Sequence, residues 1–220
     1  DYGYASCPVL AEGKLLVQVD QGHSPDEGKS KLYALDPATG KTLWEVKRPV
    51  MSSWSTPLVA LLEGKPTVFV AGNPLVMAYD LASGKEVWRA EGMGGEVAPS
   101  LAFGDGRLFV AQMGAQAMAF NAKDGKMLWS NYELALPDIS SPVYAEGILY
   151  FSSPDGTLAA LDGASGKAHW EQSLGRPAKT SPLAASGRIL IFTTDGVGRV
   201  FEAGKTVKKL GDFPMGETVA

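Results

Sequence analysis

Carboxylate and amide side chains recur at near-regular intervals along this 220-residue chain. Oxygen ligands of this kind could hold a Ca²⁺ ion, and carboxylates could act as general acids and bases. The positions concerned are Asp36, Asp80, Asn121 and Asp162. Each is followed at a fixed distance by Gly, Lys and Trp, which indicates that each belongs to its own turn. We therefore expect these side chains to lie far apart, and we assign no catalytic residue and no metal ligand.

Other residue types that could take part in catalysis or metal binding are sparse. The two histidines, His23 and His169, belong to different repeats and lack the spacing of metal ligands. Cys7 is the single cysteine, so an intramolecular disulfide is excluded, and we expect its thiol to be buried at the start of a strand. The sequence contains no G-x-S-x-G elbow and no P-loop.

The polar residues belong to an eleven-residue motif, A-x-D-x-x-[ST]-G-K-x-x-W. Its four copies run from Ala34 to Trp44, Ala78 to Trp88, Ala119 to Trp129 and Ala160 to Trp170. The third copy carries Asn121 and Asp124 in its polar positions. A period of about 41 to 44 residues predicts a stacked or radial array in which each repeat is one supersecondary unit.

The segments between the motifs predict four short strands per repeat. In the fourth repeat we expect strands at Pro142–Ala145, Ile148–Phe151, Leu158–Asp162 and Ala168–Gln172, separated by Gly-containing turns. Such a repeat is typical of a β-propeller blade. The chain is therefore predicted to be a single all-β domain over residues 1–220, with five four-stranded antiparallel blades at about 5–48, 54–91, 96–133, 139–174 and 179–212.

The motif tryptophans are interpreted as structural. Trp44, Trp88, Trp129 and Trp170 would each dock a large aromatic surface on the neighbouring blade, because one blade cannot bury its own faces. The alternative is a stacking platform for a ligand, which regular repetition disfavours.

A fifth copy of the motif departs from the pattern. The segment Val200–Lys205 is two residues short in the turn, and the Trp position falls on Lys208. We expect the fifth blade to lack a docking indole. Five blades would form either a five-bladed ring or a segment of a ring of seven or eight blades.

The loops that enter the innermost strands are the most promising place for binding. In propellers these loops surround one mouth of the central channel, and here they would present Tyr4, Trp54, Glu96, Asp138 and Lys179. Aromatic and mixed polar groups at a concave mouth suit a small polar ligand, a sugar or a peptide. Alternatively, Trp54 plugs the channel or packs on the next blade.

One inserted loop and the overall composition give further information on function. The loop Gln21–Ser30 interrupts the first repeat and is interpreted as a mobile polar hairpin rather than a functional loop. With 20 basic and 24 acidic residues and a net charge of −4, the chain shows no basic run for nucleic acid. It has no apolar run near the ~20 residues of a membrane span and no signal peptide.

The motif and its spacing resemble the tryptophan-docking repeat of pyrroloquinoline-quinone-type (PQQ-type) β-propeller proteins, over nearly the whole chain. That family includes quinoprotein alcohol dehydrogenases, which carry PQQ and Ca²⁺ in the central channel. It also includes a cofactor-free, BamB-like branch, the lipoprotein B scaffold of the outer-membrane assembly machinery.

The resemblance implies a non-catalytic scaffold without cofactor that binds a protein or peptide partner, or a small polar ligand. It implies an extracytoplasmic location in the periplasm or cell envelope. An edge strand could also accept an extended peptide. The alternative is a fragment of a PQQ- and Ca²⁺-dependent alcohol or sugar dehydrogenase. The adjacent-cysteine disulfide of those dehydrogenases cannot form here, because Cys7 is the single cysteine.

Overall fold

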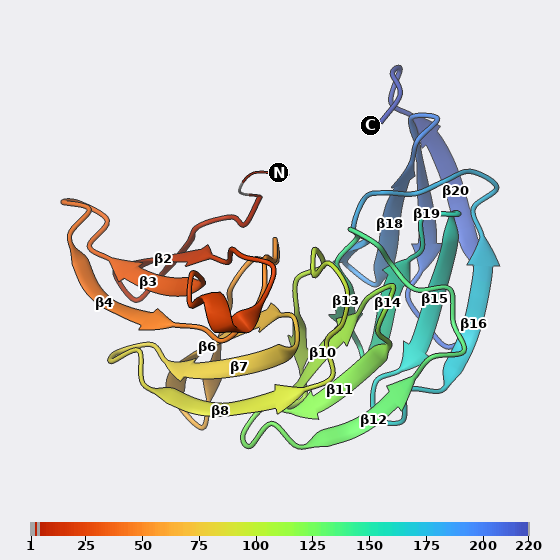
Figure 1. Ribbon diagram of the computed structural model, residues 1–220. Coiled ribbons are helices and arrows are strands. Elements are labelled where there is room, and N and C mark those ends of the chain that lie inside the picture. The colour runs from red at the N-terminus through yellow and green to blue at the C-terminus, as the bar shows by residue number, and fades with distance from the viewer. Residues whose placement is uncertain (1–2, 4, 220) are drawn as a thin grey trace. The chain divides into compact units, whose positions relative to one another are not determined.

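The computed structural model describes residue 3 and residues 5–219. Across these residues the chain forms five four-stranded antiparallel sheets, each built from four consecutive strands (Figure 1). The predicted all-β class with four-stranded blades is confirmed. The chain falls into two compact units: residues up to Leu101 together with Asn121–Lys126, and Ala102–Phe120 together with the residues from Met127 onward.

The first unit contains blades one and two. Blade one consists of β1 (Val9–Ala11), β2 (Lys14–Val19), β3 (Lys31–Leu35) and β4 (Thr42–Lys47). A single 3₁₀ turn, η1 (Pro25–Glu27), lies between β2 and β3. Blade two consists of β5 (Leu58–Leu62), β6 (Lys65–Gly72), β7 (Leu75–Asp80) and β8 (Glu86–Glu91).

The second unit contains the strands of blades four and five and most of blade three. Blade three consists of β9 (Ala102–Gly104), β10 (Arg107–Ala111), β11 (Ala117–Asn121) and β12 (Met127–Asn131). Blade four consists of β13 (Val143–Ala145), β14 (Ile148–Ser152), β15 (Thr157–Asp162) and β16 (Ala168–Ser173). Blade five consists of β17 (Leu183–Ala185), β18 (Arg188–Thr193), β19 (Val197–Glu202) and β20 (Lys209–Pro214). In blade four each strand lies within one residue of its expected bounds.

The motif residues close the turn between the third and fourth strands of a blade. In blade two, the backbone N–H of Asp80 donates to Lys85 O (2.9 Å) and that of Gly84 donates to Asp80 O (2.8 Å). The Asp80 carboxylate accepts from the backbone N–H of Ser83 at 2.8 Å and from its hydroxyl at 2.5 Å. These two bonds hold the pKa of Asp80 below its usual value. The carboxylate is thus used within its own turn.

Each motif tryptophan contacts the motif turn of the following blade. The indole N–H groups of Trp44, Trp88, Trp129 and Trp170 donate to Leu81 O, Ala122 O, Gly163 O and Gly204 O at 2.9–3.1 Å. In the turns that receive Trp44, Trp88 and Trp129, the motif glycine lies against the indole. A Cβ placed on Gly125 would lie 2.5 Å from the Trp88 ring, in addition to the strain of its φ of +72°. Glycine is therefore needed for both the turn and the close approach.

A second set of hydrogen bonds links the segments that lead into the innermost strands. Before the inner proline of blade one, the backbone N–H of Cys7 donates to Thr56 Oγ1 (3.1 Å), and that of Thr56 donates to Ser100 Oγ (2.9 Å). The prediction that Cys7 is buried is wrong, because its side chain is exposed. Cys7 precedes β1, a strand of three residues that covers little of the segment before it.

The alignment of the fifth motif also needs correction. Val200 pairs with Gly211, as Ala160 pairs with Trp170 in blade four. The Trp position is therefore Gly211 rather than Lys208. The backbone N–H of Glu202 bonds to Lys208 O (2.9 Å), whereas Asp162 bonds to Lys167 O. The turn is thus one residue longer than in blade four, not two residues shorter, and an indole is missing from the position that Gly211 takes.

The tryptophan contact predicts a graded loss of stability at Trp88, which is only 8% exposed. Trp88→Phe keeps most of the packing but leaves Ala122 O unpaired, and we expect it to cost about 1 kcal/mol. Trp88→Ala also opens a cavity and should cost about 3–5 kcal/mol. Urea unfolding measures both. Tyr132→Ala, at a site that is 77% exposed, is the control. An equal loss for Tyr132→Ala and Trp88→Ala would contradict this reading.

Candidate functional site

A buried ion pair lies in the first unit, where blades one and two meet. Asp20 follows β2 and Arg48 follows β4, and both side chains are fully buried. Arg48 Nη1 donates to both carboxylate oxygens of Asp20. Its Nη2 donates to Ala71 O of β6 at 3.3 Å. The guanidinium thus joins a carboxylate of blade one to a backbone carbonyl of blade two.

Polar side chains surround the pair. The amide nitrogen of Gln18 lies 2.8 Å from Asp20 Oδ2 and 3.1 Å from each of Ser53 Oγ, Ser55 Oγ and Ala71 O. Ser55 Oγ donates to Ala71 O at 2.8 Å. Buried charges of this kind contribute little net stability but are costly to leave unpaired. We call Gln18, Asp20, Arg48, Ser53 and Ser55 the polar cluster.

Ser53 and Ser55 of the polar cluster flank Trp54 on the connector between blades one and two. Ser53 forms an antiparallel bridge with Asp20 and a parallel bridge with Val97. The backbone N–H of Trp54 donates to Val97 O (2.8 Å), and its indole N–H donates to Gly3 O (3.0 Å). The ring is half-buried. Trp54 is therefore held from two neighbouring segments while part of its ring faces solvent.

Glu96 lies on the adjacent connector of the same unit. Its side chain is exposed, and the segment is fixed by Asn73 Nδ2, which donates to Gly95 O at 2.9 Å. The structure thus places Trp54 and Glu96 on neighbouring, hydrogen-bonded connectors. Among the described residues of the first unit, these two are the predicted mouth residues.

In the second unit, Asp138 and Lys179 are both exposed on connectors. Pro137 O accepts from Met113 N–H (2.6 Å) and Pro177 O accepts from Thr194 N–H (2.9 Å). Each connector is thereby tied to the turn between the second and third strands of a blade. Tyr4 lies outside the described residues. A single mouth formed by all five residues remains a prediction.

The inserted loop of blade one has defined local structure. Ser24 caps η1, and the Glu27 carboxylate accepts from the backbone N–H groups of His23 (2.6 Å) and Ser24 (3.1 Å). The Lys29 ammonium and these N–H groups lower the pKa of Glu27 to about 2. Ser52 N–H donates to Gly22 O (3.0 Å), which joins the loop to the Trp54 connector.

Sequence reasoning did not single out Gln18, Asp20 or Arg48. A signal was present, because Arg48 stands four residues after the motif Trp, where later repeats have Gly92, Glu133 and Leu174. None of these three residues is a cation, so Arg48 marks a departure from the repeat. The sequence gives no indication that Asp20 is its partner, since the two are far apart along the chain.

Two features are absent from the part of the chain that the structure describes. Within it, no group of three or more His, Cys, Asp and Glu side chains lies close enough to hold a metal ion. None of its helical segments has the length and apolar character needed to cross a bilayer. The chemistry that the described site offers is recognition by an aromatic ring, exposed charges and fixed backbone.

The buried ion pair predicts that the free energy of unfolding depends strongly on keeping both charged partners. Arg48→Met leaves the Asp20 carboxylate buried without its cation and should destabilise the chain by about 3–5 kcal/mol. The double variant Asp20→Leu with Arg48→Met should recover most of that loss. Arg89→Met breaks the exposed pair with Glu86 and should cost less than about 1 kcal/mol. Urea unfolding compares the three, and a double variant as unstable as Arg48→Met would contradict the pairing argument.

Comparison with known proteins assigns the repeat. The family model described as outer membrane protein assembly factor BamB matches residues 28–141 and 136–209. The BamB of Bordetella pertussis is 29% identical over 164 residues, covering 73% of this chain and 40% of its own length. That of Escherichia coli K12 is 27% identical over 200 residues, covering 87% and 48%. The chain thus spans two fifths to one half of these curated relatives.

Solved structures share the fold. BamB from Moraxella catarrhalis superposes with a TM-score of 0.74 at 20% identity, covering 94% of this chain and 62% of that chain. A europium-containing methanol dehydrogenase gives a TM-score of 0.71 at 13% identity, covering 96% and 51%. At these identities the likeness concerns the blade fold alone. The family model, in contrast, matches most of the sequence, and the chain belongs to the outer membrane protein assembly factor BamB family.

Proposed function

We propose that this chain is a protein-binding scaffold that takes part in outer membrane protein assembly on the extracytoplasmic side of the envelope. The match of the BamB family model to most of the chain carries this proposal. We assign no cofactor to the chain. The likeness to methanol dehydrogenase is one of fold, so we advance no dehydrogenase function.

The connectors around Trp54 are the proposed contact surface for a polypeptide partner. Trp is enriched among interface residues that dominate binding free energy. The indole N–H already donates to Gly3 O, so a partner would meet the exposed part of the ring. The bridges of Ser53 to Asp20 and Val97 fix the connector before binding, which lowers the entropy lost on association. The exposed charge of Glu96 at the rim would favour a partner of opposite charge.

The test uses the full-length gene product, purified from envelope extract with its bound proteins. We expect a component of the outer membrane assembly machinery, identified by mass spectrometry, to co-purify with the wild type. Trp54→Ala should weaken binding of that purified component by about tenfold or more. Tyr132→Ala is the matched aromatic control and should leave binding unchanged.

Two outcomes would count against the proposal. Unchanged affinity of Trp54→Ala would remove Trp54 from the interface. Saturable, Ca²⁺-dependent binding of PQQ, with oxidation of an alcohol or sugar by a dye acceptor, would show a dehydrogenase instead of a scaffold.

A further inference from the structure

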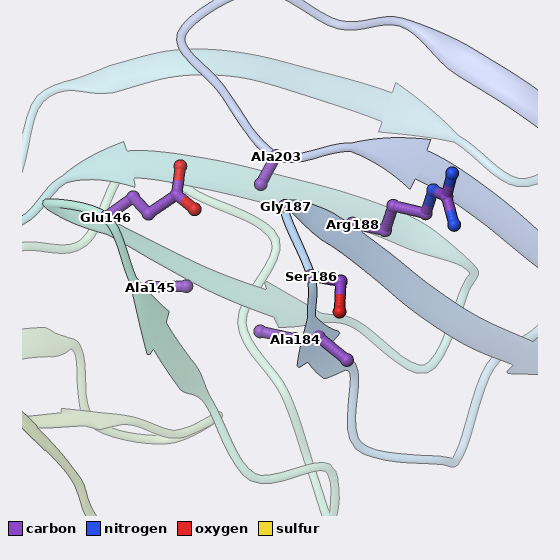
Figure 2. A pocket seen from close by; sticks show the side chains of 8 residues that line it. Ala145, Glu146, Ala184, Ser186, Gly187, Arg188 and Ala203 are labelled. Carbon is purple, nitrogen blue, oxygen red and sulfur yellow. The ribbon is translucent and has the colours of Figure 1, made fainter.

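The second unit contains an open cavity of about 110 Å³ between the first hairpins of blades four and five. Small residues line it, namely Ala145, Ala184, Gly187 and Ala203, together with Glu146, whereas the side chain of Arg188 extends away from them (Figure 2). Alanine methyl groups beside one carboxylate suit a ligand that has an apolar part and carries a hydrogen-bond donor.

The equivalent space between blades three and four is filled by a tyrosine. The ring of Tyr144 lies so close to Gly104 and Gly163 that a Cβ on either would be 2.0 Å or 2.5 Å from it. The ring stacks on Phe109, with 4.7 Å between centroids and 14° between planes. The hydroxyl donates to Asp105 Oδ2 at 2.5 Å. Burial and this hydrogen bond raise the pKa of Tyr144 to about 12.

The strand registers show that the two spaces correspond. Tyr144 is the middle residue of β13 and Ala184 that of β17. Each faces a matching residue on the second strand, because Tyr144 pairs with Leu149 and Ala184 with Ile189. Gly163 N–H donates to Gly147 O, and Ala203 N–H donates to Gly187 O, both at 2.9 Å. Ala203 therefore takes the place of Gly163.

The same strand register identifies the residues that form the remaining wall of the cavity. Gly104 and Asp105 end the first strand of blade three and open its hairpin, as Ala145 and Glu146 do in blade four. Asp105 and Glu146 share a left-handed backbone, with φ of +48° and +51°. The cavity is thus the part of that tyrosine space that stays open: the carboxylate is retained, the aromatic side chain is reduced to the methyl group of Ala184, and Ala145 and Ala203 add methyl groups where Gly104 and Gly163 have none.

We propose that this cavity binds a tyrosine side chain of a partner polypeptide, whose phenol ring enters the space vacated at Ala184 and whose hydroxyl donates to Glu146. The site rests on the repeat geometry and does not depend on the function proposed above. The methyl groups of Ala145 and Ala203 narrow the space, so the ring enters less deeply than Tyr144 does. A closed cavity of about 150 Å³ holds benzene, and a smaller open one admits a phenol in part and excludes an indole.

Arg188 also lines the opening, but its side chain extends away from Glu146 and Ala203 (Figure 2), so we assign it no contact with the inserted ring. A single side chain in a shallow site binds weakly, so we expect dissociation constants in the millimolar range for isolated ligands.

The experiment follows alanine methyl resonances by NMR, because four alanines line the cavity. The probes are N-acetyl-tyrosinamide, N-acetyl-phenylalaninamide and p-cresol. We expect saturable shifts of the Ala145, Ala184 and Ala203 methyls, with the tyrosine probe binding about fivefold more tightly than the phenylalanine probe, since the latter lacks the hydroxyl. Tighter binding of the tyrosine probe than of p-cresol would support a polypeptide ligand.

Three variants test whether the probes bind in this cavity. Ala184→Tyr fills the space from within and should abolish the shifts, whereas Tyr132→Ala, at an exposed site outside the cavity lining, should leave them unchanged. Glu146→Gln should reduce the preference for tyrosine over phenylalanine. The proposal is overturned if the wild type shows no saturable shifts, if Ala184→Tyr binds as the wild type does, or if both amino-acid probes bind equally. Equal binding of p-cresol and the tyrosine probe would overturn the polypeptide assignment.

Discussion

The contact on which the rest of the structure depends joins an indole to a backbone turn. In each of four junctions a tryptophan on the fourth strand of one blade donates to a carbonyl in the motif turn of the next blade. In three of these junctions the turn needs a glycine beneath the ring, as the close approach at Gly125 shows. The aspartate serves this contact indirectly, because its bonds to backbone N–H groups set the shape of the turn. The motif aspartates, which could otherwise act as acids, bases or metal ligands, thus help to hold the blades together.

The proposed binding surfaces lie where the chain departs from its repeat. The buried pair of Asp20 and Arg48 falls in one junction, and Asp20 bridges to Ser53 on the connector that carries Trp54. The cavity at Ala184 falls in another junction, where an aromatic side chain is replaced by a methyl group. The motif turns of the first four blades keep the same backbone hydrogen bonds. A scaffold held by backbone contacts can therefore vary the side chains between blades without losing its architecture.

The sequence predicted the blade fold because its signals are local and repeated. Glycine, proline and tryptophan fix turns and strand starts within a few residues of themselves, and blade four was found within one residue of its expected strands. The fifth motif was misaligned at Lys208 because one added turn residue shifts the register, and register depends on strand pairing. The exposure of Cys7 depends on how little β1 covers, and the partnership of Arg48 with Asp20 depends on packing between distant segments.

The junction contact also has a direction. One side of a blade offers an N–H donor on its fourth strand, and the other side offers a turn that receives the preceding indole. The turn at Gly40 has the same form, and a Cβ placed there meets no described atom within 4 Å. Such head-to-tail contacts are heterologous, so identical units can be joined in any number without a new kind of interface. The whole period is consequently the smallest insertion or deletion that leaves every remaining junction chemically intact.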